Sequence, residues 1–316
     1  MRPIFRHALA VVLAVAFLGC PKDKEKEKPV EAAKPRVAVS IFPLHDLAKR
    51  VAGDRLDVVL ILPPGKSEHG YEPTPKEVAR VADSKLVVLA GFSMDEWAEK
   101  LVRTASPNVQ SLALAPKCEP QAFTQDHVGE AAAAEVAKDD GDEGEEPGAM
   151  DPHFWLDPVR MQTATDVLVA EFSKLDPSGA AAFKANGEDV KKSLGALHAE
   201  LDAAQQKWSK RKVVTFHASM GYFIGRYKLE LAAVIEPFPG REPTAKYMAE
   251  VLEAVKKTGA AALFSEPQLD RAPAKTVADQ ARLPLFELDP VGGTPGVETY
   301  EKLLKSNAAV LDKALQ

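Results

Sequence analysis

Cysteine is scarce in this chain, and so is any excess of positive charge. Only Cys20 and Cys118 occur among 316 residues, so a chain of this size must bury its cores without a disulfide framework, and thiolate sites for soft metals are disfavoured. The formal net charge of −6 argues against a nucleic-acid partner and against a polybasic membrane patch, because both require basic surfaces. What remains is a globular chain, 46% hydrophobic and long enough for two domains.

Long apolar runs are equally scarce, and the only one lies close to the N-terminus. Ala8–Leu18 is apolar throughout and follows Arg2 and Arg6, which is the arrangement of a signal peptide. The run is too short to cross a bilayer, and no other segment is long and apolar enough to do so. The sequence therefore predicts an exported protein.

Cys20 lies where cleavage of the signal peptide would occur. Residues 1–20 resemble the signal peptides of bacterial lipoproteins, in which the cysteine is acylated and becomes the new N-terminus. Phe17 and Leu18 differ from the usual residues of that motif, so secretion without acylation is the alternative. Acylated Cys20 would anchor the chain to a lipid membrane, in the periplasm or at the outer face. Residues 21–35 alternate lysine with acidic residues and bury little, which predicts a disordered tether.

Short aliphatic or β-branched runs recur beyond this tether, and helical patterns separate them. Their positions are 37–41, 58–62 and 86–90, then 213–216, 231–235, 261–264 and 285–288. Strands that alternate with helices imply βαβ units and parallel sheets. We therefore predict an α/β fold with two lobes, an N-terminal lobe over residues 36–177 and a C-terminal lobe over residues 212–316.

The strongest helical pattern lies between these two halves. One apolar stripe runs along it: Phe183, Val190, Leu194, Leu197, Leu201 and Trp208. Asp176 is a candidate cap, and Pro177 suits the first turn. The pattern predicts a linking helix over residues 178–211, of which Ser178 to Trp208 would span roughly 45 Å. Such a rigid rod could join the lobes and restrict their relative motion; packing within one domain is the alternative.

Residues 125–150 form the low-complexity segment of the chain. An alanine run is followed by a cluster of aspartate and glutamate, which predicts a mobile, acidic surface loop. Most acidic runs are simply solvated, and a weak role in gathering cations is the alternative.

Three of the seven histidines lie beside predicted strand ends or helix starts. His69 follows the second predicted strand through a loop, His153 lies at a loop-to-helix junction, and His217 directly follows a strand. Asp289 also follows a strand, and ligands of open α/β sheets bind beyond the carboxyl ends of strands. Three imidazoles and one carboxylate suit a four-coordinate zinc ion. The other histidines beyond the signal peptide are interpreted as structural or solvated: His45, His127 and His198.

The segments around these residues resemble the zinc- and manganese-binding receptors of ABC transporters. The matching motifs are PPGKSEHGYEPTP at 63–75, DPHFWLDP at 151–158, TFHASMGYF at 215–223, and SEPQ at 265–268 with LDP at 288–290. The resemblance covers nearly the whole chain from Arg36 on. It implies two α/β lobes with parallel sheets joined by one long rigid helix, a metal cleft between the lobes, and an ABC transporter membrane permease as partner.

The resemblance also implies the metal ligands, which are His69, His153, His217 and Asp289. Glu68 is similar to a glutamate of the zinc-uptake members and is an alternative ligand. Glu266 is expected to hydrogen-bond an imidazole and hold its tautomer. Zinc is favoured over manganese, because manganese members usually have proline at position 68 and glutamate at position 217. Many zinc members carry a histidine-rich loop before the second motif, whereas the loop here is acidic and contains only His127.

The predicted function is capture of zinc, or of manganese, outside the cytoplasm and its delivery to an ABC importer by a monomeric, non-enzymatic receptor. Two alternatives follow from the same residues. Three histidines with an open position are also typical of a zinc-dependent hydrolase, with Glu68 or Glu266 as the base. A receptor for an organic solute shares the two-lobed plan but leaves the placement of the histidines unexplained.

Overall fold

The structure is a computed structural model, and it describes residues 33–123, 149–237 and 243–316. Some predictions concern segments outside the described residues: the signal peptide with Cys20 and its acylation, the tether over 21–32, and the acidic segment 125–148 with His127. Residues Lys34–Gln316 form one compact unit. Within the described ranges, no helix combines the length and the apolarity that a membrane span needs.

The first sheet has four parallel strands in the order β2-β1-β3-β4. The strands are β1 (Arg36–Val39), β2 (Asp57–Leu60), β3 (Ser84–Leu89) and β4 (Gln110–Ala113), and the helices between them are α1 (Phe42–Ala52), α2 (Pro75–Arg80) and α3 (Glu96–Ala105). Three of these strands were predicted. The fourth, β4, lies at the sheet edge, and its polar Gln110 and Ser111 hide the apolar signal of a strand.

The second sheet repeats this topology in the order β6-β5-β7-β8. Its strands are β5 (Lys212–Thr215), β6 (Glu230–Val234), β7 (Ala262–Ser265) and β8 (Leu285–Glu287), and its helices are α8 (Gly221–Arg226), α9 (Ala245–Thr258), α10 (Ala272–Ala281) and α11 (Tyr300–Leu315). All four strands were predicted. In both sheets the second strand along the chain lies at an edge, and the third strand lies on the other side of the first. The topological switch point, where the strand order reverses, is therefore between the first and third strands, β1 and β3 or β5 and β7.

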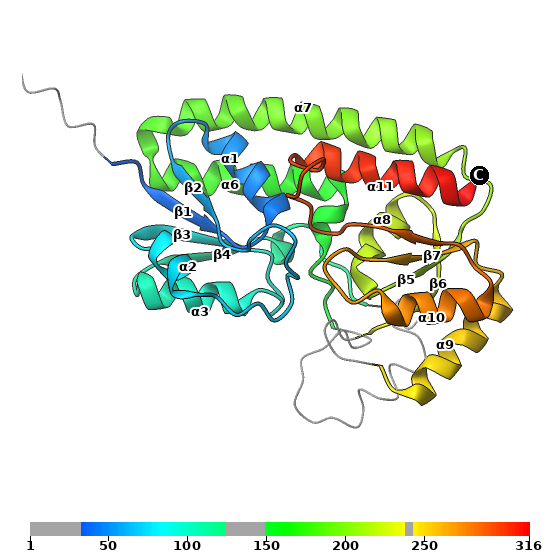
Figure 1. The fold of residues 1–316 in the computed structure, drawn as a ribbon. Coiled ribbons are helices and arrows are strands. Elements are labelled where there is room, and N and C mark those ends of the chain that lie inside the picture. The colour runs from blue at the N-terminus through cyan, green and yellow to red at the C-terminus, as the bar shows by residue number, and fades with distance from the viewer. Residues whose placement is uncertain (1–32, 124–148, 238–242) are drawn as a thin grey trace, which may run out of the picture. The chain divides into compact units, whose positions relative to one another are not determined.

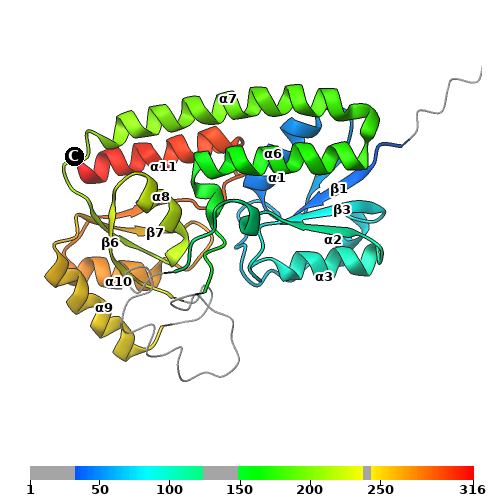
Figure 2. The ribbon, with the colours of Figure 1, turned by 180° about the vertical axis from the view of Figure 1, so that it is seen from behind.

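Both sheets are covered on two faces, as parallel sheets require (Figures 1 and 2). Val37 and Val39 of β1 face one cluster, and Ala38 faces another, because successive side chains of a strand point to opposite faces. Helices α2 and α3 lie against one face of the first sheet, and α9 and α10 against the corresponding face of the second. The other face of each sheet belongs to one continuous core that also includes residues of α6 (Pro158–Leu175), α7 (Ala180–Gln205) and α11.

Helix α7 (Ala180–Gln205) connects the half that contains the first sheet to the half that contains the second. Its buried residues include five of the six residues of the predicted stripe, Phe183, Val190, Leu194, Leu197 and Leu201, whereas the sixth, Trp208, is buried beyond the end of the helix. The regular helix is shorter than the predicted range of 178–211 at both ends, because a 3-10 turn (Pro177–Gly179) precedes it and it ends at Gln205. It measures about 39 Å at 1.5 Å per residue. The two-lobed α/β fold with a long helix is thereby confirmed.

Helix α7 packs closely on α6 (Pro158–Leu175), and one glycine permits this approach. A Cβ atom on Gly187 would lie 2.6 Å from Cγ2 of Val169, whereas a Cβ on Gly195 would have its nearest neighbour at 3.8 Å. Gly187 therefore serves packing, although glycine weakens a helix in isolation.

Candidate metal centre

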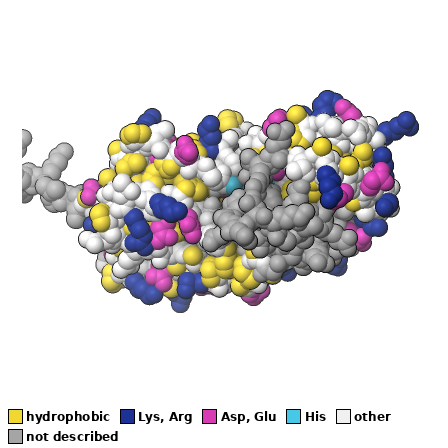
Figure 3. All heavy atoms as spheres, turned by 90° about the horizontal axis from the view of Figure 1, so that it is seen from below, with side chains coloured by type: hydrophobic (Ala, Val, Ile, Leu, Met, Phe, Trp, Pro, Cys, Tyr) yellow, Lys and Arg dark blue, Asp and Glu magenta, His cyan; other side chains and the backbone are white. Residues whose placement is uncertain are grey.

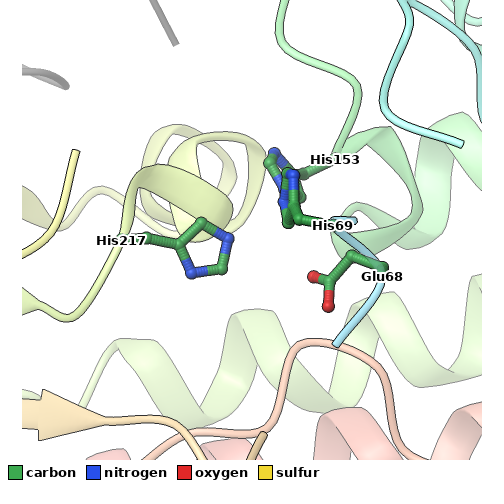
Figure 4. Close-up of side chains that lie close together, drawn as sticks. All are labelled: Glu68, His69, His153 and His217. Carbon is green, nitrogen blue, oxygen red and sulfur yellow. The ribbon is translucent and has the colours of Figure 1, made fainter. Parts of the chain in front are cut away.

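Three separate segments bring four potential metal ligands together. Glu68 and His69 lie within the loop between β2 and α2, His153 precedes the 3-10 turn Phe154–Leu156 at the start of α6, and His217 follows β5. One ligand atom from each of the four side chains lies within 4.8 Å of the others. Figure 4 shows the His217 imidazole pointing from the second half towards His69, His153 and Glu68.

The three imidazoles form a nearly equilateral triangle. The ring centroid of His69 lies 5.5 Å from that of His153 and 5.3 Å from that of His217, and the last two are 5.3 Å apart. The Nε2 atoms of His69 and His153 are 3.3 Å apart. Two nitrogens that bind a tetrahedral zinc ion at 2.0–2.1 Å are about 3.3–3.4 Å from each other, so these two imidazoles already have the spacing of zinc ligands.

The loop that carries Glu68 and His69 is held by its own residues and by α3. The backbone N–H of His69 donates to Ser67 Oγ at 3.2 Å, and Trp97 Nε1 donates to the Glu68 carbonyl at 2.9 Å. The ring of Tyr71 packs edge-on against Trp97, with centroids 5.2 Å apart. These contacts fix the backbone of both potential ligands before any ion binds.

His153 is oriented by the carboxylate of Asp151. Asp151 Oδ1 accepts from the backbone N–H of His153 at 2.9 Å and lies 2.8 Å from its Nδ1, and both residues are fully buried. A carboxylate on Nδ1 fixes the tautomer and leaves Nε2 to face a metal. Asp151 was not among the predicted site residues, although an aspartate two positions before a histidine is a recognisable local hydrogen-bonding pattern.

His217 is oriented in the same way by Glu266, which follows β7. Glu266 Oε1 lies 2.7 Å from Nδ1 of His217 and also accepts from Ser219 Oγ at 3.3 Å. Strand β7 is next to β5 in the sheet, so the residues that follow these two strands meet at the same edge. Glu266 thus contacts the His217 imidazole, and its role in holding the tautomer of that ring stays a prediction.

Burial shifts the protonation equilibria of the group. Burial, with the neighbouring imidazoles, holds the pKa of His69 and of His153 well below 6.5, so both rings are neutral at pH 7 and offer lone pairs. Burial raises the pKa of Glu68 to about 7; the charge of His217 opposes this shift, and the carboxylates of Glu266 and Asp289 add to it. A cation among these side chains would relieve the cost of ionising Glu68.

The Glu68 carboxyl group fits a role as the fourth ligand. The residue is 1% exposed, and within the described part of the chain its Oε1 has no hydrogen-bond partner. A buried polar atom without a hydrogen-bond partner costs desolvation free energy, unless a bound ligand interacts with it. Three imidazole nitrogens and one such oxygen are the donor set of a zinc site.

Asp289 lies outside this group of four. Its Oδ1 accepts hydrogen bonds from Gln268 Nε2 at 2.7 Å, from the Val291 N–H at 3.0 Å and from the Gly292 N–H at 2.8 Å. Its charge still acts on Glu68, as the raised pKa of Glu68 records. The ligand role of Asp289 stays a prediction.

The remaining described histidines lie away from these residues. His45 is on α1, and His198 is on α7 with its Nδ1 3.3 Å from the Tyr227 hydroxyl. At the surface, Figure 3 shows histidine only as a small patch on the face it displays. His69 is the partly exposed member of the group, whereas His153 and His217 are buried.

Comparison with known proteins decides the family. Residues 37–314 match the model of the family ZnuA, described as the zinc-uptake complex component A, periplasmic. The chain belongs to the ZnuA family. The predicted resemblance to metal receptors of ABC transporters is therefore confirmed at the level of the family.

Relatives within and around the ZnuA family are distant in sequence. The high-affinity zinc uptake system protein ZnuA of Brucella abortus is 28% identical over 341 residues, covering 100% of this chain and 99% of that protein. The zinc-binding lipoprotein AdcA of Streptococcus pneumoniae is 26% identical over 315 residues; the match covers 96% of this chain, which spans only 59% of AdcA. The structure of FpvC from Pseudomonas aeruginosa in complex with Mn²⁺ gives a TM-score of 0.76 at 25% identity, covering 90% of this chain and 99% of FpvC.

Proposed function

We propose that this chain is an extracytoplasmic receptor that binds one zinc ion and delivers it to the membrane permease of an ABC importer. The observation that carries the proposal is the convergence of Glu68, His69, His153 and His217, whose ligand atoms lie within 4.8 Å of one another. The names of the relatives agree with it, since AdcA and the Brucella protein are both named for zinc.

We infer zinc as the preferred ion and manganese as the alternative. Imidazole nitrogens with a single carboxylate oxygen favour four-coordinate zinc, whereas manganese prefers more oxygen ligands. The 3.3 Å separation of the His69 and His153 Nε2 atoms suits a tetrahedron. FpvC, which has a similar fold, has a structure in complex with Mn²⁺, so the fold alone does not select the metal.

The same donors argue against a zinc-dependent hydrolase. A catalytic zinc site keeps one position open for water, whereas Glu68 supplies a fourth protein ligand among the three imidazoles. The ZnuA family is a class of solute-binding receptors. An organic solute is disfavoured because the potential ligands are inward-facing imidazoles with neutral nitrogens.

We further propose acylation of Cys20, a lipid-anchored location in the periplasm or at the outer face of a membrane, and a monomeric state. The support for anchoring is the apolar run before Cys20 and the lipoprotein name of AdcA. Labelling the expressed protein with a palmitate analogue tests it. Incorporation of the analogue that is lost in Cys20→Ala supports the lipid anchor. Export of the unaltered chain without incorporation of the analogue would contradict acylation and would support secretion without an anchor.

Titration calorimetry with zinc and with manganese, after removal of metal by a chelator, tests the central proposal. We expect one tight zinc ion per chain, weaker manganese, and loss of tight zinc binding in His217→Ala. Tight manganese with weak zinc would keep the receptor and overturn the metal. Absence of a tight site for either ion would overturn the metal receptor itself.

A further inference from the structure

Tyr222 joins the two histidines that come from opposite halves of the structure. It lies on the first turn of α8, in the same segment as His217, and it is only 1% exposed. Its hydroxyl donates to the backbone carbonyl of Asp151 at 3.0 Å and accepts from the Gln121 N–H at 3.1 Å. A side chain from the second half therefore forms hydrogen bonds to the segment that leads to His153.

Tyr222 is connected to the His153 imidazole through a single residue, Asp151. The carbonyl of Asp151 accepts from Tyr222, while its carboxylate accepts from the backbone of His153 at 2.9 Å and lies 2.8 Å from Nδ1 of that ring. The N–H of Asp151 is held as well, because it donates to the Gln121 carbonyl at 2.9 Å. Asp151 thus cannot move without moving both Tyr222 and His153.

The other end of the connection is equally well fixed. His217 leads into the 3-10 turn Ala218–Met220 and then directly into α8, so little free chain separates it from Tyr222. Glu266 holds the His217 ring at Nδ1, 2.7 Å away. The positions of the two imidazoles are therefore coupled through Tyr222 and Asp151.

The tyrosine itself is clamped in place. The guanidinium of Arg160 lies 4.7 Å from the centroid of its ring. Arg160 is in turn fixed by Asp157 Oδ2 at 2.6 Å and by the Glu119 carbonyl at 3.1 Å. Burial raises the pKa of the Tyr222 hydroxyl to about 12, so the group stays protonated and able to donate a hydrogen bond at pH 7.

We propose that Tyr222 is a positioning residue of the metal centre, whose hydroxyl acts through Asp151 to set the separation of the His153 and His217 imidazoles. The inference rests on the proposed metal binding, and it assigns to Tyr222 a role in affinity and coordination geometry. Partners that orient metal ligands commonly change metal affinity about 10–100-fold when they are removed.

The test compares Tyr222→Phe with Tyr227→Phe. Both variants remove one buried hydroxyl near α8, but that of Tyr227 lies against His198 and away from the metal centre. Zinc affinity is measured by competition with a chromogenic chelator, and geometry by the visible absorption spectrum of the Co²⁺-loaded protein. We expect about a tenfold loss of zinc affinity and a changed Co²⁺ spectrum in Tyr222→Phe, and wild-type values in Tyr227→Phe.

A double-mutant cycle with Asp151→Asn tests the route through Asp151. If Tyr222 acts on His153 through Asp151, the losses of zinc affinity in the two single variants do not add in the double variant. Additive losses, or a Tyr222→Phe protein with wild-type affinity and spectrum, overturn the inference. Absence of tight zinc binding in the unaltered chain would instead overturn the proposed function, so the two failures are distinguishable.

Discussion

His69 and His153 are separated by 84 positions in the sequence, yet their Nε2 atoms lie 3.3 Å apart. This spacing places two neutral imidazoles as two corners of a zinc tetrahedron, with His217 and Glu68 nearby as the other two. The relationship is a property of the fold, because each histidine is held by a different loop.

The first prediction concerns which carboxylate is the fourth ligand. Glu68 belongs to the group of ligand atoms, whereas Asp289 Oδ1 is engaged in three hydrogen bonds. We expect Glu68→Gln to weaken zinc binding by about tenfold or more, and Asp289→Asn to weaken it less. Chelator competition on both variants measures the difference. A larger loss in Asp289→Asn would identify Asp289 as the ligand and would imply that its loop moves when zinc binds.

The second prediction concerns stabilisation by metal. A ligand at 100 times its dissociation constant stabilises the folded state by about 2.7 kcal/mol, which corresponds to a rise in Tm of about 4–5 °C for a chain of this size. We expect this rise with zinc at pH 7, and a rise below about 2 °C in His153→Ala at the same zinc concentration. Magnesium serves as the control, because it prefers oxygen ligands in octahedral geometry. Equal shifts with zinc and magnesium would contradict binding at the imidazoles.

The third prediction concerns acid stability of the metal-free protein. Burial lowers the pKa of His45 from 6.5 to about 4, and nearby Lys49 and Arg80 add to the shift. The unfolded chain then takes up a proton below pH 6.5 while the folded chain does not. The contribution of His45 to stability is present above pH 6.5 and is lost as the pH falls towards 4.

Replacement of His45 isolates this contribution from the other titrating groups. Glu68 acts with the opposite sign, because its pKa is raised to about 7 and its contribution is lost as the pH rises from 4.5 through 7. Urea unfolding of the wild type and of His45→Gln at pH 7 and at pH 5 cancels that effect. We expect the wild type to lose about 1–2 kcal/mol more than the variant over this range. Identical losses would show that His45 is not protonated on unfolding.

The fourth prediction concerns two glycines of α7. A Cβ atom on Gly187 would lie 2.6 Å from Val169, so Gly187→Ala is expected to destabilise the fold by about 1–3 kcal/mol despite the better helix propensity of alanine. Gly195 has open space, and Gly195→Ala is expected to stabilise by about 0.5–1 kcal/mol. Thermal or urea unfolding of both variants measures the contrast. Stabilisation in both would mean that α6 and α7 can separate at low cost.

Local patterns carried much of the fold. Seven of the strands are recognisable in the sequence as short aliphatic runs, and the apolar stripe on α7 follows the helical period. Both patterns arise because side chains that are buried on a sheet face or on one face of a helix must be apolar. Strand β4 was not predicted, because it is short and two of its residues, Gln110 and Ser111, are exposed at the edge of the sheet. The cap of the long helix also differed, since Asp176 precedes a 3-10 turn and its side chain makes no capping hydrogen bond to the helix backbone.

The sequence by itself determined the α/β class, the two repeated sheets, the long helix and the three histidines, because each depends on a local period or on a motif that stays contiguous along the chain. Only the tertiary structure decided which carboxylates lie beside them: Glu68 in the group, Asp151 on His153, Glu266 on His217, and Asp289 outside the group. These relationships depend on loops from both sheets meeting at angstrom spacing. Strand order and packing set that spacing, and no local pattern encodes it.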